Sequence, residues 1–425
     1  METAHHMPST IGRLMDWLER RAKPAAKGTY RRPLISAAAC WRSMLSRTCV
    51  IGITGSAGKT TTKELLHAAL ATRHRCTKSS NSNNQLYDVA RSLLSSAPWT
   101  RFCVQEIGAS VPGTFAPMMA LLKPQVAVVT NVGNDHIQAF RTREAVAAEK
   151  VRLVASLPAD GIAVLNADDP LVAAMASHCN ARIVTYGMRS AAQFRAEVMT
   201  DKWPDRLALR IHHDNDTVLA STQLLAPYQA TNVLAAVATA CSLGISLEQA
   251  AQAVGRHEPM LGRMSVYRSA RGVTVIRDDW KAPDWSLLKA VQYIADARAA
   301  RKLIVIGTIS DSGGRRHLYR NAVAGAVAAA DRVLLVGPRA AAASRRLGTV
   351  GGEKLLAFAL AQDAARWLTD FVREGDLVLL KGSNNADHLA RLALALDQDV
   401  GCWRAHCPRR VICDRCRLRG VLAGP

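Results

Sequence analysis

Short apolar runs alternate with helical stretches along most of the chain. Before residue 258 we predict five buried strands, at 49–53, 102–105, 126–130, 162–165 and 182–186. Helical patterns lie between several of them, and strands that alternate with helices form mainly parallel sheets. We therefore predict an α/β domain over residues 49–257 that binds its ligand at the carboxyl ends of the strands.

A different pattern follows within the same domain. Polar and apolar residues alternate over 194–225, with turn-forming pairs at Trp203-Pro204 and at Asp214 and Asn215. This period predicts an antiparallel side sheet. An alanine-rich stretch over 231–243 predicts a helix.

A second set of strand-like runs begins after residue 258. The runs at 273–276, 303–306, 332–336 and 377–380 are separated by helical stretches such as 322–330. We predict a second, Rossmann-like domain over 258–400. Its loop at 307–314 follows a strand and is rich in small and polar residues, so it is a candidate ligand-binding edge.

The two ends of the chain are too short to be domains. Residues 1–48 are basic and helix-prone, with interruptions at Pro24 and around Gly28 and Pro33, and we expect a short helical arm that docks on the rest of the protein. Residues 401–425 form a tail rich in cysteine and arginine.

Composition narrows the class of protein. The chain has 425 residues, 49% of them hydrophobic, and no apolar run long enough to span a bilayer. The N-terminus lacks the apolar core of a signal peptide, so we expect a cytoplasmic protein that does not contact membranes. The formal net charge of +21 favours anionic partners, among them a nucleotide and either an anionic substrate or nucleic acid.

The stretch VIGITGSAGKTTTKE, residues 50–64, has the features of a phosphate-binding loop. An apolar strand leads into glycines and then into a helical pattern, so backbone N–H groups and the helix N-terminus can face phosphate oxygens. The predicted nucleotide-binding residues are Gly55, Ser56, Ala57, Gly58, Lys59, Thr60 and Thr61. Lys59 would reach the outer phosphates and the Thr60 hydroxyl would bind Mg²⁺. The spacing departs from the usual motif because Ile53 stands where its first glycine belongs.

Polar residues follow two further predicted strands. Glu106 comes directly after 102–105, where a carboxylate can hold the magnesium of a nucleotide. His136 follows 126–130 beside Asp135, as a candidate site residue or as a capping or core histidine. Lys150 lies in a helical run and, taken alone, is typical of a solvated lysine.

Many separate motifs resemble those of the Mur ligases, in the same order. They are ITGSAGKTTTKE, NSNN, QEIGAS, TNVGNDHIQAF, AAEKVRL, LNADDP, ATNVLAA, LGRM, DDWKAP and VLLKGS. Mur ligases are ATP-dependent amide-bond enzymes of peptidoglycan synthesis, related to folylpolyglutamate, poly-γ-glutamate and cyanophycin synthetases. The resemblance covers residues 49–396. It implies a reaction in which a carboxylate attacks the γ-phosphate of ATP to form an acyl phosphate, which an amine then attacks.

The resemblance also implies roles for residues. Lys59 would steady the outer phosphates, while Thr60 and Glu106 would hold one Mg²⁺. His136 would hold a second Mg²⁺ together with Lys150, which in several members carries a CO₂-derived carbamate.

Four more residues match positions that approach ATP or the acid and amine. Asn232 matches an asparagine on the adenine side, and Arg263 matches an arginine at the hinge into the last domain. Asp279 and Lys381 match the active-site edge of that last domain. The implied partners are ATP, a carboxylic acid and an amine that is an amino acid or peptide, at least one of them anionic.

Two departures from the family pattern lead us to expect a ligase of a specialised or secondary pathway. The family's UDP-sugar-binding first domain does not precede the nucleotide loop, and the amine-pocket motif is shortened to DDWKAPDWS, with Trp280, Lys281 and Trp285. The alternatives are a peptidoglycan-type ligase that adds D-amino acids, and a nucleotide-dependent RNA-binding protein.

The tail gives a separate prediction. Cys402, Cys407, Cys413 and Cys416 lie within fifteen residues, which in a cytoplasmic protein favours Zn²⁺, with His406 as an alternative ligand, over disulfides. An iron–sulfur cluster uses the same ligands, and a structural clamp needs no metal. Six arginines surround the cysteines, which also fits a carrier protein or nucleic acid: Arg404, Arg409, Arg410, Arg415, Arg417 and Arg419.

Overall fold

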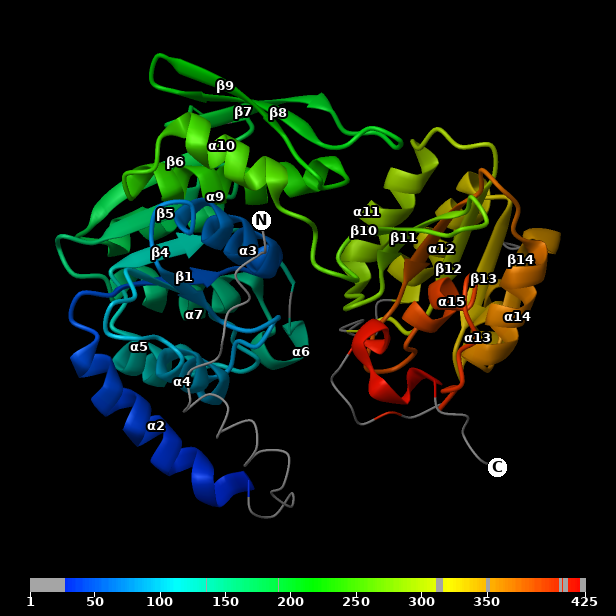
Figure 1. Cartoon of the computed structure of the whole chain (residues 1–425), viewed down its shortest axis with the longest axis horizontal. Helices are drawn as coiled ribbons and strands as arrows, with labels where there is room; N and C mark the ends of the chain where they lie inside the picture. The colour runs from blue at the N-terminus through cyan, green and yellow to red at the C-terminus, as the bar shows by residue number, and fades with distance from the viewer. Residues whose placement is uncertain are drawn as a thin grey trace. The chain divides into compact units, whose positions relative to one another are not determined.

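The computed structural model describes residues 27–134, 136–189, 191–310, 316–348, 352–404, 407 and 412–420. These residues form two compact units (Figure 1). The first contains the residues up to Met199 together with Ala208–Thr222 and Gln229–His257. The second contains Thr200–Leu207, Gln223–Tyr228 and the residues from Glu258 onward. Asp135 and His406 lie outside the described residues.

The first unit is built on a nine-stranded sheet in the order β2-β3-β1-β4-β5-β6-β7-β8-β9. Its strands are β1 (Cys49–Thr54), β2 (Cys76–Lys78), β3 (Phe102–Glu106), β4 (Val126–Val129), β5 (Ile162–Asn166), β6 (Arg182–Gly187), β7 (Phe194–Thr200), β8 (Ala208–His213) and β9 (Asp216–Ser221). The strands from β2 to β6 pair in parallel, as the alternation of strands and helices predicts.

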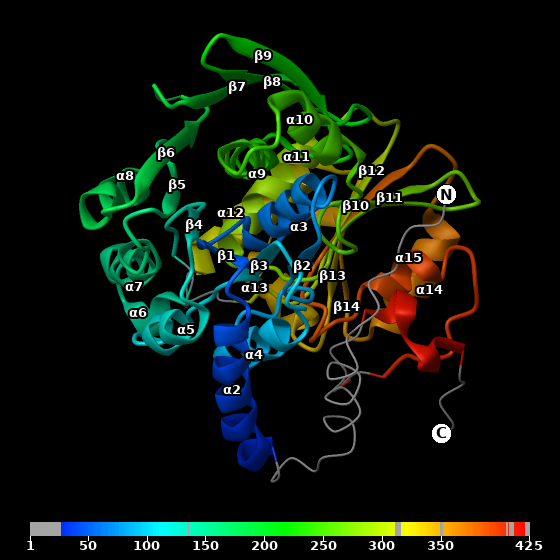
Figure 2. The ribbon, with the colours of Figure 1, turned by 60° about the vertical axis from the view of Figure 1, so that its left-hand side comes forward.

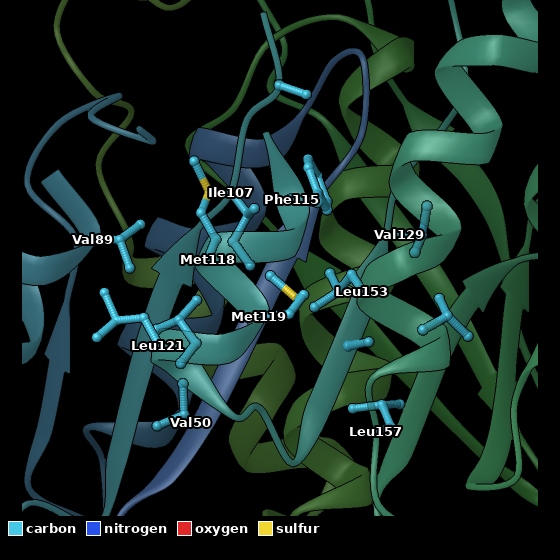
Figure 3. Packing of buried hydrophobic residues seen from close by; sticks show 14 of the residues in the cluster. Val50, Val89, Ile107, Phe115, Met118, Met119, Leu121, Val129, Leu153 and Leu157 are labelled. Atoms are coloured by element: carbon cyan, nitrogen blue, oxygen red, sulfur yellow. The ribbon is translucent and has the colours of Figure 1, made fainter. Parts of the chain in front are cut away.

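Helices cover both faces of this sheet (Figures 1 and 2). Helices α3 (Lys59–Leu70), α9 (Ala230–Ser242) and α10 (Leu247–Arg256) pack together on one face. Helices α4 (Leu86–Leu94), α5 (Phe115–Leu122) and α7 (Arg143–Ala155) lie on the other. The core beneath this second group is mainly apolar and includes the buried residues Ile107, Met118 and Leu153 (Figure 3).

The prediction of an antiparallel side sheet over 194–225 is confirmed in part. Strands β8 and β9 do form an antiparallel hairpin around Asp214, but β6 pairs with β7 in parallel. The hairpin therefore continues the main sheet. Alternation of polar and apolar residues indicates that one face of a strand is exposed. This is true both of a small side sheet and of the last strands of a large sheet, so the pattern does not distinguish between them.

The predicted interruption around Gly28 and Pro33 is wrong. Helix α2 (Lys27–Met44) runs through Gly28 and Pro33, although an interior proline costs about 3 kcal/mol. Its residues Leu34 and Ala38 are buried in the core with α4 and α5. Tertiary packing, rather than local preference, therefore fixes this helix.

The second unit contains a six-stranded sheet in the order β10-β11-β15-β12-β13-β14. Its strands are β10 (Ser265–Arg268), β11 (Thr274–Asp278), β12 (Lys302–Ile306), β13 (Arg332–Val336), β14 (Leu355–Phe358) and β15 (Leu377–Lys381). Only the pair β10–β11 is antiparallel. Helices α11 (Asp284–Ala295) and α12 (Arg316–Ala329) pack against each other, as do α14 (Ala361–Phe371) and α15 (Ala390–Leu394). The sequence pattern missed β2, β10 and β14, which have only three or four residues each.

Candidate active site

The predicted phosphate-binding loop requires glycine at two positions. Gly55 has φ 147° and Gly58 has φ 82°, both in the region that L side chains rarely adopt. A Cβ atom at Gly55 would lie 1.8 Å from Thr130 Oγ1, and one at Gly58 would lie 2.0 Å from Asn232 Oδ1. The loop thus fits closely against its neighbours, and Asn232 of α9 lies beside it.

The segment after β4 fixes the shape of this loop. Ala57 N donates to Asn131 Oδ1 at 2.9 Å, and Thr130 Oγ1 donates to the Ala57 carbonyl at 2.6 Å. Gly133 N donates to Ser56 Oγ at 2.7 Å. Because these bonds hold the first half of the loop, the N–H groups that open α3 keep the position of an anion-binding helix N-terminus.

Oxygen atoms gather beside the start of α3. Thr60 Oγ1 donates to Glu106 Oε2 at 2.9 Å and lies 3.1 Å from Ser82 Oγ. Glu106 is 1% exposed, and its Oε1 accepts from Asn84 Nδ2 at 3.0 Å. Hydroxyl and carboxylate oxygens next to a phosphate-binding loop are the donors that Mg²⁺ prefers, so the residues present fit this ion.

Sequence reasoning missed Lys63, which holds the same corner together. Its ammonium is fully buried, 3.7 Å from Glu106 Oε2 and 3.3 Å from Glu64 Oε1. It donates to the carbonyls of Ser79, at 2.9 Å, and Asn81. The pattern that could have revealed it is its place one helical turn after Lys59 and Thr60, on the buried face of α3.

Lys150 is buried in α7, at 2% exposed, so it is not the solvated helix lysine that its local sequence suggests. The neighbouring Glu149 accepts hydrogen bonds from Gly113 N at 3.0 Å and Phe115 N at 2.7 Å. His136 lies after β4 with φ 50° and is half-buried. A second metal site at His136 and Lys150 stays a prediction.

In the second unit, the predicted residue Asp279 is bound by a buried arginine. Arg277 Nε and Nη2 lie 3.3 and 3.2 Å from the two oxygens of Asp279. Burial raises the pKa of the Asp279 carboxyl above its ordinary value, and the Arg277 guanidinium opposes that rise. Lys381 donates to Asp278 Oδ2 at 2.5 Å, and Arg263 lies in the turn before β10.

The predicted ligand edge at 307–314 is occupied by the protein's own carboxylate where the structure describes it. Asp387 Oδ2 accepts from Thr308 N at 2.6 Å and from Ser383 N at 3.3 Å. A Cβ atom at Gly307 would lie 2.3 Å from the same oxygen. Asp387 therefore takes the place of an anion at this edge and joins the loops after β12 and β15.

The cysteine tail is held by an arginine. Arg391 is 4% exposed, and its guanidinium donates to the carbonyls of Cys402 at 3.0 Å, Arg404 at 3.2 Å and Asp387 at 3.1 Å. It also lies 5.3 Å from the centre of the Trp403 ring. Five N–H donors in a fixed fork can bind several carbonyls at once, so this side chain clamps the tail to the unit.

The structure does not support the predicted zinc site. The described residues include the four tail cysteines. Among the described residues, no group of three or more His, Cys, Asp or Glu side chains is placed to hold a metal ion. Burial raises the pKa of the Cys413 thiol to about 12. In the tail, the hydrogen bonds of Arg391 reach the carbonyls of Cys402 and Arg404.

The described helices also include none with the length and apolar character needed to cross a bilayer.

Two family models match the chain. The Mur ligase middle domain matches residues 53–240, and the domain described as "Mur ligase, glutamate ligase domain" matches residues 262–384. These matches cover the phosphate-binding loop, Glu106, Asp279 and Lys381.

Curated relatives and solved structures agree with these matches. The UDP-N-acetylmuramoyl-tripeptide--D-alanyl-D-alanine ligase of Mycobacterium tuberculosis is 31% identical over 376 residues, which are 83% of this chain and 74% of that protein. The enzyme of the same name from Bacillus subtilis is 26% identical over 340 residues, 79% of this chain and 73% of its own. A crystal structure of MurF from Acinetobacter baumannii has a TM-score of 0.79 at 24% identity, covering 86% of this chain and 80% of that one. MurF ligase from Thermotoga maritima in complex with ADP has a TM-score of 0.71 at 22% identity, covering 85% and 82%.

Proposed function

This chain belongs to the Mur ligase family of ATP-dependent amide-bond-forming enzymes, and from that premise we propose its reaction. A carboxylate oxygen of the acid attacks the γ-phosphorus of ATP, and ADP leaves. An amine nitrogen then attacks the acyl carbon, loses a proton and expels phosphate from the tetrahedral intermediate. The protein needs only to position these groups and to neutralise charge.

The observation that carries this proposal is the buried corner of Thr60, Glu106 and Lys63 beside the phosphate-binding loop. Glu106 is held by Asn84, Thr60 and Lys63, so its carboxylate is fixed before any ligand binds. Mg²⁺ bound there would offset the charge of the outer phosphates. Lys59, whose Nζ donates to the Gly55 carbonyl at 2.5 Å, lies on the loop that would hold those phosphates.

We extend the proposal to a second Mg²⁺ near His136 and to a carbamate on Lys150. The burial of Lys150 within α7 supports it. Carbamate formation replaces an ammonium by an anionic oxygen ligand, which suits a hard cation.

The amine pocket is proposed for the loop that follows β11. Asp279 is fixed there by Arg277, Trp280 is half-buried and Lys281 is exposed. A lysine at this place suits a carboxylate on the acid or on the incoming amine. From this loop we propose a ligase of a specialised pathway, with addition of D-alanyl-D-alanine, the activity in the relatives' name, as the alternative.

The test is ADP release by the purified protein with ATP and Mg²⁺, across amino acids and carboxylic acids offered singly and in pairs. One pair is UDP-N-acetylmuramoyl-tripeptide with D-alanyl-D-alanine. We expect stimulation only when an acid and an amine are both present, loss of it in Lys59→Ala, and retention in the control Lys202→Ala, an exposed lysine.

Each result decides between the proposals. Trapping the acid as its hydroxamate with hydroxylamine would support the acyl phosphate. Stimulation by the UDP-tripeptide pair alone would replace the specialised pathway by the peptidoglycan reaction. If the rate of ADP release does not change with any acid or amine, including that pair, the result would contradict ligase activity.

A further inference from the structure

Arginines form a row along the edge of the first unit's sheet where β2, β3 and β1 begin. Phe102 pairs with both Cys49 and Cys76, so the residues just before these positions lie side by side. Arg101 N donates to the Arg75 carbonyl at 2.8 Å, and Cys49 N donates to the Arg101 carbonyl at 2.9 Å. Neighbouring strands are about 4.8 Å apart, which spaces Arg75, Arg101 and Arg47 across three consecutive strands, with Arg73 two residues before Arg75.

The side chains of this row are exposed, and one aromatic ring accompanies them. Arg47, Arg73, Arg75 and Arg101 are exposed, and the Arg101 guanidinium lies 5.5 Å from the centre of the Phe102 ring. Trp99, two residues before Arg101, is 67% exposed and is the only aromatic among the exposed large hydrophobic residues of the described chain. We call these four arginines and Trp99 the basic edge.

Few acidic residues occur in the part of the chain that carries the basic edge. Residues 31–134 contain twelve lysines and arginines but only Glu64, Asp88 and Glu106 as acids. Glu64 pairs with Lys63 and Lys78, and Asp88 caps the start of α4. Glu106 lies in the buried corner beside the phosphate-binding loop. Within the described residues, the four arginines form no ion pair, so no direct partner neutralises their charge.

The basic edge is separate from the nucleotide site. Strand β1 begins beside the basic edge at Cys49 and ends at Thr54, just before the phosphate-binding loop. At about 3.3 Å per residue, the strand places the two ends roughly 17 Å apart. A molecule on the basic edge would leave the nucleotide loop open.

We propose that the basic edge binds single-stranded nucleic acid. A row of guanidiniums suits a chain of phosphates, because each planar fork can bind two phosphate oxygens. An exposed indole next to that row provides a surface on which a base can stack. A lipid surface would require a larger apolar area than this single ring offers.

The test is fluorescence anisotropy of a labelled oligouridine with the full-length protein, measured at several salt concentrations. Binding weakens as salt rises, with a slope of about −0.7 in log–log form for each phosphate contact. The double variant R75A/R101A should therefore make the slope shallower by about 1.4. Trp99→Ala should lower affinity roughly five-fold or more at constant slope, because a stacked base contributes ~1 kcal/mol or more.

The matched control is R195A/R210A, which removes two exposed arginines from β7 and β8. It should leave the slope unchanged, and circular dichroism checks that every variant is folded. Three outcomes would overturn the proposal: no salt-dependent binding, an equal loss of slope in the control, or tighter binding to vesicles of phosphatidylglycerol that depends on the same residues. None of these outcomes bears on ADP release, so the proposed ligase activity is tested separately.

Discussion

Asp414 of the tail accepts a hydrogen bond at 2.6 Å from Arg277 Nη1, and the same guanidinium binds Asp279 through its other two nitrogens. The Arg277 and Asp279 side chains are 1% and 2% exposed, and that of Asp414 is 17% exposed. A residue near the end of the chain therefore helps to fix a carboxylate at the proposed amine pocket.

We predict that Asp414→Asn weakens both the second unit and the reaction. It removes one of the two carboxylates that compensate a buried guanidinium, which costs about 1–3 kcal/mol. Thermal unfolding should occur at a lower temperature, and kcat/KM for the acid and amine should fall. Asp414→Glu should recover most of both, and Asp363→Asn, at an exposed site, should change neither. Normal kinetics in a destabilised Asp414→Asn protein would restrict this residue to a structural role.

Lys63 and Lys78 both pair with Glu64, but only Lys63 is fully buried. We predict that Lys63→Met lowers the free energy of unfolding by about 3–5 kcal/mol, because it leaves buried carboxylates without their partner. Lys78→Met should cost about 1 kcal/mol or less, since that pair is partly exposed and screened by solvent. Urea denaturation of the two variants measures the difference. Equal losses would show that the buried ammonium adds nothing beyond a surface pair.

The fold was predictable wherever the local pattern of apolar residues matches the burial of the same residues in the folded protein. The strand predicted at 332–336 is β13, because parallel buried strands are continuous apolar runs. The path of α2 through Pro33 was not predictable, because it depends on Leu34 and Ala38 meeting helices distant in sequence.

The candidate site shows the same division. The loop from Gly55 to Thr60 was predictable from the order of strand, glycines, Lys-Thr and helix. The place of Lys63 beside this loop was not, because it depends on contacts with the carbonyls of Ser79 and Asn81. For the tail cysteines, the sequence predicted a site that the structure does not support. Their spacing suggests zinc, but spacing does not reveal that Arg391 already binds the surrounding carbonyls.

Burial of the Cys413 thiol leads to a prediction about its reactivity. Its pKa of about 12 leaves about one molecule in 10⁴ as thiolate at pH 8, and the thiolate is the reactive form. Iodoacetamide at pH 8 should therefore label the exposed Cys40 long before Cys413. The Cys413 rate should rise about tenfold for each pH unit up to about 12. Peptide mass spectrometry after timed quenching measures both rates, and rapid labelling of Cys413 at pH 8 would contradict a half-buried, protonated thiol.

Gly58 is where backbone conformation and side-chain contact both bear on nucleotide binding. Gly58→Ala places a methyl group at φ 82° and against Asn232, whereas Gly244→Ala meets the same positive φ, 90°, with no atom within 4 Å. The Gly244 variant should lose only the backbone cost of about 1–2 kcal/mol and should bind ADP normally. Gly58→Ala should lose more stability and should weaken ADP binding, as measured by calorimetry. Adding Asn232→Ala should return part of the lost stability, because it removes the steric conflict but not the strain. If Gly58→Ala behaves like Gly244→Ala in both measurements, the contact with Asn232 does not shape the loop.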